Sequence, residues 1–352
     1  MLDIIFSFIL SFFLSFTIIP FVIKTAIHRN ILDISDDRKS HVGAVPSLGG
    51  VGIFVSIFFV LMLTIPIAHF DNFRYILTSL GIIFLLGAQD DLRPLSPLAK
   101  LCGQLIAVTI LIALADIRIT QLYGLFGLDS VSYGWSVLLS MGFYLFIINS
   151  YNLVDGINGL CSSLVIVAMS LLGCWFYMLG FYEFSTFAFI VCGATLAFLK
   201  YNVTPARIFM GDTGSLVLGT VCAILMIQFL EINMAITGHP LTFDSPIIIA
   251  IGVMIIPIYD TLRVFAIRIA EGTSPFEPDR RHLHHLMLDA GLSHMQSTAS
   301  LLIFNGIALL VSWQLQDINP ILGFMVLVFL SILFTQIVKL FGASKPSVVR
   351  SS

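Results

Sequence analysis

The sequence has little charge: Asp, Glu, Lys and Arg make up only 11% of its 352 residues, whereas 58% are hydrophobic. Soluble domains carry about 25% charged residues, so an ordinary soluble enzyme is excluded, and no nucleic-acid partner is expected. Cysteine is scarce as well. The five cysteines lie in or beside apolar runs, without a CxxC pair or a Cys/His metal spacing. They are expected to be small buried hydrophobes.

Apolar runs of about 20 residues are abundant, and this length crosses about 30 Å of hydrocarbon. They predict an all-α polytopic membrane protein with about eleven transmembrane helices. We expect one transmembrane domain over residues 1–342 and a short tail at 343–352. The predicted spans are roughly 3–26, 48–68, 74–89, 98–117, 134–149, 158–179, 184–200, 213–231, 245–267, 297–316 and 319–341.

Basic residues are distributed asymmetrically between the two sides of these spans. Arg74 and Arg118 fall on one side, and the other fifteen of the 17 Lys and Arg residues fall on the opposite side. The positive-inside rule makes the basic side cytoplasmic, which places the N-terminus in the periplasm and the C-terminus in the cytoplasm. The first span has no basic region before it and no clear cleavage site, so it is expected to be a retained helix rather than a signal peptide.

Four polar stretches interrupt the apolar chain, and all are predicted to lie on the basic side. They gather carboxylates, histidines, arginines and glycines beside a bilayer. This combination favours metal-assisted phosphate chemistry at a membrane surface over a pore or a structural protein. The stretches are DDLRPLSPLAK from Asp90, NSYNLVDGINGL from Asn149, YNVTPARIFMGDTGS from Tyr201 and SPFEPDRRHLHHLM from Ser274.

Asp90 and Asp91 end the third predicted span. Two adjacent carboxylates at the interface cost free energy unless a cation or water compensates. One function for them is metal binding. Another is that of a base whose pKa is raised by its neighbour and by partial burial. The simpler alternative is a solvated helix end with Arg93 and Lys100 as partners.

The second and third stretches each centre on one aspartate beside glycine. Asp155 shares a short turn with Asn152 and Asn158, where glycines let backbone N–H groups approach a ligand. Asp212 follows a glycine at the start of an apolar helix, which suits a Mg²⁺ ion bridging the oxygens of a diphosphate. The alternatives are an ordinary polar turn and a helix N-cap. Phe209 lies outside the apolar spans and could stack on a base.

The fourth stretch contains Arg280, Arg281, His282, His284 and His285. Zinc is disfavoured here, because adjacent histidines cannot share a helix face, no fourth ligand is near, and arginines repel a cation. Arginine forks and imidazoles around phosphate and sugar hydroxyls fit better, and an ordinary basic loop is the alternative.

Several other polar residues receive weaker interpretations. Lys39 and His41, in the first polar loop, are candidates for phosphate contact or ordinary flanking charges. Asp260 and Arg263 are expected to form an ion pair that stabilises a helix end, and His294 is given no role.

Together the four stretches resemble the polyprenyl-phosphate N-acetylhexosamine-1-phosphate transferase superfamily of membrane enzymes, over nearly the whole chain. The HLHH form is similar to the WecA branch, whereas the peptidoglycan branch has three consecutive histidines. The resemblance rests on DD at Asp90, NxxNLVDGxxGL from Asn149, NxxPAxIFMGDxGS from Asn202 and PDRxHLHH from Pro278.

The resemblance implies a reaction in a bacterial cytoplasmic (inner) membrane, with the active site facing the cytoplasm. Undecaprenyl phosphate would attack UDP-GlcNAc to give undecaprenyl diphosphate-GlcNAc and UMP, with Mg²⁺ as cofactor and Mn²⁺ as a possible substitute. The product would start a lipid-linked surface polysaccharide, such as O antigen or enterobacterial common antigen. A homodimer is possible.

The resemblance also implies roles for single residues. Asp212 would bind Mg²⁺, and Asp90, with Asp91 beside it, would deprotonate or orient the lipid phosphate. Asp155 would complete the acidic site. The substrate-binding candidates are Phe209 on uracil, Asn202 and Asn158 on uridine, Asn152, the group Arg280, Arg281, His282, His284 and His285 on the diphosphate and sugar, and more weakly Lys39 and His41.

One departure from the pattern limits the mechanism. Position 158 is Asn, where many bacterial relatives have a second Asp, and an amide is neither a base nor a strong metal ligand. Two alternatives stay open at this point. UDP-linked GalNAc, QuiNAc or FucNAc could replace UDP-GlcNAc. A transporter of anionic lipid or nucleotide sugar would instead need ionisable residues at mid-membrane, and the predicted spans are nearly free of them.

Overall fold

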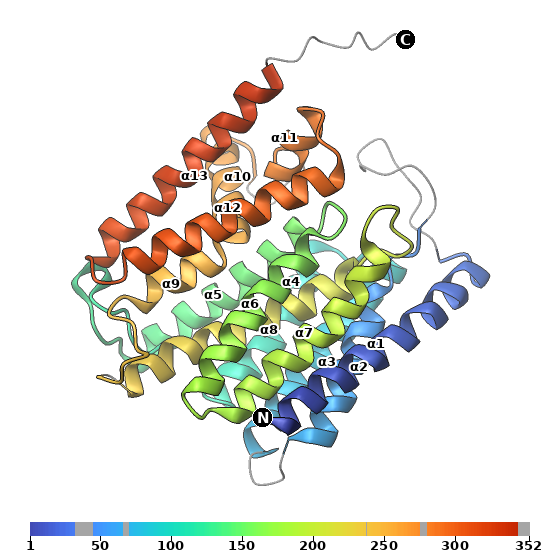
Figure 1. Cartoon of the computed structure of the whole chain (residues 1–352), viewed down its shortest axis with the longest axis horizontal. Coiled ribbons are helices and arrows are strands. Elements are labelled where there is room, and N and C mark those ends of the chain that lie inside the picture. The colour runs from blue at the N-terminus through green and yellow to red at the C-terminus, as the bar shows by residue number, and fades with distance from the viewer. Residues whose placement is uncertain (32–44, 66–69, 237, 275–279, 344–352) are drawn as a thin grey trace.

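The computed structural model describes residues 1–31, 45–65, 70–236, 238–274 and 280–343, and this part of the chain is almost entirely helical (Figure 1). Gln121 and Ser130 form an isolated antiparallel bridge. The helices are α1 (Leu2–His28), α2 (Gly49–Thr64), α3 (Phe70–Leu92), α4 (Pro97–Ala113), η2 (Leu125–Gly127), α5 (Tyr133–Val154), α6 (Leu160–Met178), α7 (Tyr182–Asn202), α8 (Gly211–Ala235), α9 (Pro246–Val253), α10 (Ile255–Ala270), α11 (Leu283–Asp289), α12 (His294–Gln314) and α13 (Pro320–Ala343).

Eight of the described helices are long and apolar enough to cross a membrane: α1, α3, α5, α6, α7, α8, α12 and α13. The apolar helices α2 and α4 are shorter, and α9 and α10 form a bent pair. The all-helical, polytopic fold class is therefore confirmed. Each predicted span overlaps one of these helices, whereas the number of crossings and their direction stay predictions.

The ninth predicted span is not one straight helix, which corrects the sequence interpretation. The axes of α9 and α10 differ by 81°. Pro257 lies in the first turn of α10, where it has no N–H to donate to the carbonyl of Val253, and its ring would clash with that carbonyl if the helix were continuous. Instead the Asn305 side chain of α12 donates to the Val253 carbonyl at 3.4 Å. The break is therefore supported by a partner from another helix.

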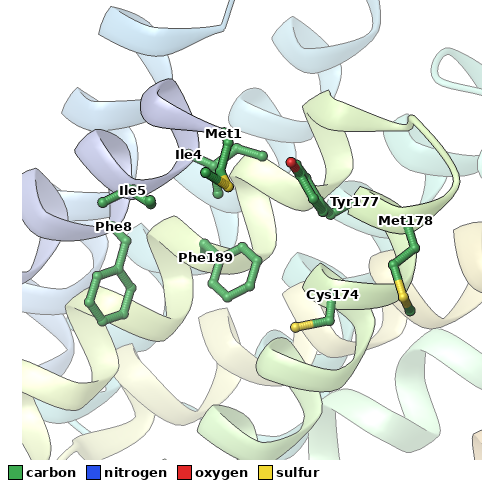
Figure 2. Close-up of a pocket in the computed structure, with 8 residues that line it drawn as sticks. All are labelled: Met1, Ile4, Ile5, Phe8, Cys174, Tyr177, Met178 and Phe189. Atoms are coloured by element: carbon green, nitrogen blue, oxygen red, sulfur yellow. The ribbon is translucent and has the colours of Figure 1, made fainter.

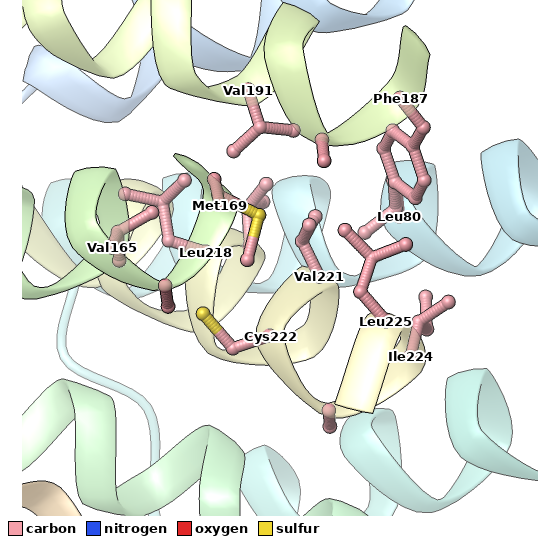
Figure 3. Close-up of a cluster of buried hydrophobic side chains, with 14 of the residues drawn as sticks. Leu80, Val165, Met169, Phe187, Val191, Leu218, Val221, Cys222, Ile224 and Leu225 are labelled. Carbon is pink, nitrogen blue, oxygen red and sulfur yellow. The ribbon is translucent and has the colours of Figure 1, made fainter. Parts of the chain in front are cut away.

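Helix α8 lies at the centre of the fold. Buried residues make up 89% of its most apolar 18-residue stretch, and it packs against α2, α3, α5, α6 and α9. Figure 3 shows its side chains among those of neighbouring helices, such as Leu80 of α3, Met169 of α6 and Phe187 of α7. Helices α9 to α13 lie along one side of this bundle (Figure 1).

Glycines let two helices approach the first turn of α8 closely. A Cβ on Gly50 of α2 would lie 2.1 Å from the backbone nitrogen of Gly214, and one on Gly87 of α3 would lie 2.6 Å from the Cα of Thr213. No real Cβ tolerates such contacts. The backbone of α8 is therefore held directly against α2 and α3 at the point where Asp212 begins its helix.

The described parts of all four polar stretches meet at one end of the bundle, as predicted for a shared side. We call this the motif end; it comprises the last turns of α3, α5 and α7, the first turns of α4, α6 and α8, and α11, whose His284 ring lies against Gly156. Near the opposite end, helices α1, α6 and α7 surround an apolar pocket (Figure 2). Its lining is Met1, Ile4, Ile5, Phe8, Cys174, Tyr177, Met178 and Phe189, which offers little to a phosphate.

Candidate active site

The ammonium group of Lys100 joins two of the polar stretches. Its Nζ lies 2.9 Å from Asp90 Oδ2 and also contacts Asp212 Oδ2, a residue 112 positions further along the chain. The other oxygen of Asp212 accepts a hydrogen bond of 2.7 Å from the Asn152 amide. We call Asp90, Lys100, Asn152, Asp155 and Asp212 the acid cluster. It brings three of the predicted aspartates together with the predicted Asn152.

Asp91 has a different environment from Asp90, although the two are neighbours in sequence. Its Oδ1 accepts the backbone N–H of Asp212 at 2.8 Å, and its Oδ2 accepts the N–H of Thr213 at 3.0 Å and the Thr213 hydroxyl. Helix α8 has no side-chain cap of its own. Asp91 therefore caps α8 from α3, and Asp212 does not act as the N-cap that the simpler alternative proposed.

Gly211 is required where this cap is built. Its φ is +71°, in the left-handed region that favours glycine. A Cβ there would lie 2.0 Å from the Ser47 carbonyl oxygen and 2.6 Å from Asp91 Oδ2. The glycine before Asp212 thus lets the cap and the chain leading into α2 reach the start of α8.

Asp155 follows the last residue of α5 and completes the acid cluster. Loss of solvent around it, followed by the negative charges of Asp212 and Asp91, raises the pKa of its carboxyl well above the usual range. This shift favours the neutral form of Asp155. A group tuned in this way beside other acids is typical of an active site.

The turn after Asp155 is tied to two other helices. The Asn202 amide accepts from the N–H of Gly159 at 2.7 Å and donates to the Ile208 carbonyl at 3.0 Å. Asn158 donates from its amide to the Thr204 hydroxyl at 2.9 Å. Uridine binding by Asn158 or Asn202 would compete with these bonds, so that role stays a prediction.

His294, which was given no role from the sequence, belongs to the same junction. At the start of α12, its Nδ1 accepts from the backbone N–H of Asn158 at 3.4 Å, and the Thr298 hydroxyl donates to the Asn158 carbonyl at 2.9 Å. No local sequence pattern predicts this contact, because the partners are far apart along the chain. The first turn of α12 thus fixes the turn beside Asp155.

The histidines of the fourth stretch lie against the second stretch. The His284 ring is so close to Gly156 that a Cβ on this glycine would lie 2.1 Å from Nε2. Burial, with the charge of His285 as the next cause, lowers the pKa of His284 to about 3, so this ring is neutral. Burial also lowers the pKa of His285, followed by the charge of Arg280. The rings of His282 and His284 are stacked, with centroids 5.8 Å apart.

The two arginines of this stretch lie further from the acid cluster. Arg280 is exposed and 3.7 Å from Asp289, and Arg281 contacts Glu271. The expected ion pair between Arg263 and Asp260 is confirmed, with Nη2 2.9 Å from Oδ1. Asp260 also bonds to His282, so the pair is more than a helix-end contact.

Phe209 is half-buried in a short extended segment next to the start of α2. Its N–H donates to the Pro46 carbonyl at 2.8 Å, and its carbonyl accepts from Gly49 at 2.9 Å. These bonds join the third stretch to the chain that enters α2. Lys39 and His41 lie outside the described residues.

The acid cluster offers oxygen ligands to a hard cation. Among the described residues, no three His, Cys, Asp or Glu side chains already form a metal cage. Mg²⁺ typically uses one or two protein carboxylates together with phosphate oxygens and water. Asp212 and Asp90, with Asp155 nearby, fit this need, and the Lys100 ammonium shows that the position between two of these carboxylates accepts positive charge.

Lys100 is the main residue that sequence reasoning undervalued, because it was considered only as a partner for a solvated helix end. A local signal was available. Ser96 caps α4 by accepting from the N–H of Ala99, and Pro97 starts the helix. This pattern predicts a helix start and places Lys100 in the first turn, next to the end of α3.

Comparisons with known proteins find a matching family and several relatives. The model of glycosyl transferase family 4 matches residues 72–230, which include Asp90, Asp155 and Asp212. A protein of Bacillus subtilis, named a probable undecaprenyl-phosphate N-acetylglucosaminyl 1-phosphate transferase, is 30% identical over 96% of this chain and 92% of its own length. An undecaprenyl-phosphate alpha-N-acetylglucosaminyl 1-phosphate transferase of Escherichia coli O157:H7 is 30% identical over 86% of this chain and 81% of its own.

A third relative differs in the lipid that its name gives. It is a decaprenyl-phosphate N-acetylglucosaminephosphotransferase of Mycolicibacterium smegmatis, 30% identical over 77% of this chain and 72% of its own length. All three names include N-acetylglucosamine and a phosphate; two of them give undecaprenyl phosphate as the lipid and the third gives decaprenyl phosphate.

Proposed function

This chain belongs to glycosyl transferase family 4 and is a membrane phospho-sugar transferase, and on that basis we propose that it transfers N-acetylglucosamine 1-phosphate from UDP-GlcNAc to undecaprenyl phosphate. An oxygen of the lipid phosphate attacks the sugar-linked phosphorus. The bond from that phosphorus to the bridging oxygen breaks, and UMP leaves. One phosphoanhydride replaces another, so the step is nearly isoenergetic and reversible.

One observation carries this proposal: Asp90 and Asp212, from two separate stretches, converge on the Lys100 ammonium at the motif end. Two anionic substrates must approach each other in this reaction, so fixed positive charge and acids that orient it are needed together. Asp90 orients or deprotonates the lipid phosphate, and Lys100 faces the phosphates of the donor. Asn152 holds Asp212 in place through its amide.

A Mg²⁺ ion would be held by Asp212, with Asp90 and Asp155 within the same cluster. When bound, it would neutralise charge on the donor diphosphate. A cation there would also favour the ionised form of Asp155, whose proton the desolvated site otherwise retains.

The location of the site supports a lipid acceptor. The acid cluster lies at the ends of helices that are apolar enough to span a bilayer, so a polyprenyl phosphate can reach it from the membrane. We propose that the motif end faces the cytoplasm of a bacterial inner membrane, where the nucleotide sugar is, and that residues 1–342 form one domain with about eleven crossings. The product would then start a lipid-linked surface polysaccharide.

Release of UMP by the purified protein tests the proposal. The assay contains UDP-GlcNAc with or without undecaprenyl phosphate and with or without Mg²⁺, and we expect UMP only when lipid and metal are both present. Decaprenyl phosphate and UDP-GalNAc in parallel reactions distinguish acceptor and donor. Release with UDP-GalNAc alone would reassign the donor, and no release with any pair would reject the transferase proposal.

The Asp212→Asn variant provides the matching loss-of-function control. The amide keeps the shape of the side chain and removes the charge that Lys100 and the metal require, so we expect turnover to fall by at least about 10³-fold at every Mg²⁺ concentration. Near wild-type activity at high Mg²⁺ would remove Asp212 from the proposed metal site.

A further inference from the structure

Residues 281–283 lead into α11. Each of them is hydrogen-bonded to one of two side chains of α10, Asp260 or Arg263. Asp260 Oδ2 lies 2.9 Å from His282 Nδ1, and its Oδ1 accepts the N–H of Leu283 at 2.9 Å. Arg263, one turn further along α10, donates to Asp260 Oδ1 and to the carbonyl of Arg281. The backbone on both sides of His282 and its ring are therefore fixed from α10.

We propose that Asp260 and Arg263 are positioning residues that hold His282 in the one tautomer and orientation in which its Nε2 is presented to the sugar diphosphate. We call this pair the α10 clamp. The identity of the substrate in this inference rests on the proposed function, whereas the geometry of the clamp follows from the contacts alone.

The burial of the clamp argues for a purpose beyond stability. Asp260 is 1% exposed, and the side chain of Arg263 is 10% exposed. A buried ion pair is often no more stabilising than an apolar contact of the same shape. Among the described residues, the hydrogen bonds of the pair lie within it or go to residues 281–283. The charges of the pair therefore serve to position residues 281–283.

The carboxylate determines which nitrogen of His282 is free. Because Asp260 is an acceptor at Nδ1, that nitrogen carries the proton, and Nε2 is the nitrogen left for a substrate group. A carboxylate behind a histidine orients the ring in this way in many enzymes. The sequence interpretation placed His282 on the diphosphate and sugar, and the clamp supplies the support that such a role needs.

The clamp also relates the histidines to the acid cluster. His282 stacks on His284 with an angle of 7° between the rings, and His284 rests against Gly156, next to Asp155. A shift of His282 would therefore move the surface that faces Asp155. Without the α10 clamp, the distance between the histidines and the acid cluster would not be fixed.

A double-mutant cycle tests whether the clamp acts through His282. We expect Asp260→Asn to lower kcat/KM for UDP-GlcNAc by about 10- to 100-fold, the usual effect of losing a supporting carboxylate. In the His282→Ala background the same substitution should cost less than about twofold, because the group that it positions is gone. Fold-changes that multiply in the double variant would overturn the proposal, since a purely structural role gives independent effects.

Hydrogen exchange tests the geometry without any turnover. In Asp260→Ala we expect amides of residues 281–289 to exchange at least about 10-fold faster, while amides of α8 stay as in the wild type. Arg263→Met, which keeps the apolar stem and removes the guanidinium, should have the same effect on 281–284. Unchanged exchange in this segment in both variants would also overturn the proposal.

Tyr259→Phe is the matched control, because it removes a buried hydrogen bond from the same helix. Its hydroxyl lies 2.9 Å from the Thr335 hydroxyl of α13 and not at the histidines. We expect turnover within about twofold of the wild type and no change in exchange at 281–289. A wild type that releases no UMP would reject the proposed function, and the exchange result would still decide the clamp.

Discussion

At the scale of single residues, Asp90 and Asp91 show how adjacent carboxylates acquire separate tasks. Asp90 pairs with Lys100 at 2.9 Å, whereas Asp91 accepts backbone N–H groups at the start of α8. The sequence alone could not separate them, because both stand at the end of one span. Their partners come from other parts of the chain.

We predict that substitution of these two aspartates separates turnover from stability. Asp90→Asn should lower kcat far more than it changes UDP-GlcNAc binding, and should leave Tm nearly unchanged. Asp91→Asn replaces one of the two accepting oxygens of the cap with an amide group that cannot accept, and should lower the free energy of unfolding by about 1–2 kcal/mol, together with partial loss of turnover. Thermal unfolding in detergent, donor titration and initial rates of UMP release measure these effects. Equal losses of Tm in both variants would contradict the assignment.

Asp155 leads to a prediction on pH. Its carboxyl has a raised pKa in the folded protein, whereas an Asp in the unfolded chain titrates at about 3.9. The folded state therefore binds the proton more tightly, and the stabilisation from this group is complete below about pH 3.9 and is lost as pH rises toward the raised folded value.

Asp155→Asn should therefore stabilise the substrate-free protein at neutral and higher pH, because an amide cannot ionise. We expect a higher Tm than wild type at about pH 8, a difference that disappears near about pH 4, and no turnover at either pH. A Tm series against pH without added metal makes the comparison. A wild type that is the more stable of the two at about pH 8 would show that Asp155 is not held neutral.

At the scale of elements, the close approach of α3 to α8 sets the distance between two halves of the acid cluster. Gly87 lies against the backbone of Thr213, whereas Gly81, on the same helix, has no heavy atom within 4 Å of a Cβ built on it. Gly87 therefore makes a close contact with another helix that Gly81, on the same helix, does not make.

We predict that Gly87→Ala separates α3 from α8 and impairs both folding and turnover, by about 1–3 kcal/mol in the free energy of unfolding. Gly81→Ala serves as its control and should be neutral or stabilising by up to about 1 kcal/mol, since alanine is the better helix former. Tm and the rate of UMP release in both variants give the result. Equal behaviour of the two would mean that the α3–α8 contact does not position Asp90 against Asp212.

For the individual elements, the sequence predicted those features that local sequence patterns determine. Apolar runs located the helices, and the four polar stretches marked the motif end. It did not predict the break between α9 and α10, because Pro257 is as compatible with a mild kink as with an 81° bend until Asn305 is seen to donate to the Val253 carbonyl. Nor did it connect Asp260 with His282, which lies 22 residues away at the N-cap of α11.

At the scale of the whole molecule, the distribution of basic residues predicts the orientation in the membrane. The motif end holds Arg93, Lys100 and Arg207, whereas Arg74 and Arg118 flank helices at the other end. Cytoplasmic flanks carry the excess of basic residues in membrane proteins. The site would then face the compartment that contains nucleotide sugars.

Cysteine labelling in intact cells tests this orientation. In a variant whose exposed Cys102 and Cys174 are replaced by alanine, we expect Asp129→Cys to react with a membrane-impermeant maleimide in intact cells. Arg93→Cys should react only after the cells are made permeable. The reverse pattern would invert the proposed topology while leaving the acid cluster as described.

The enclosure of α8 has a consequence for the order in which the protein is made. Chains emerge from the ribosome N-terminus first, so α2, α3, α5 and α6 are already in the bilayer when α8 arrives. Only then does Asp212 meet Lys100, and Asp91 finds the backbone that it caps. The acid cluster is thus completed late in biogenesis, when α8 docks, and the histidines of the fourth stretch are added after it. A nascent chain released before residue 211 would contain most of the predicted membrane-spanning helices but would lack a complete acid cluster.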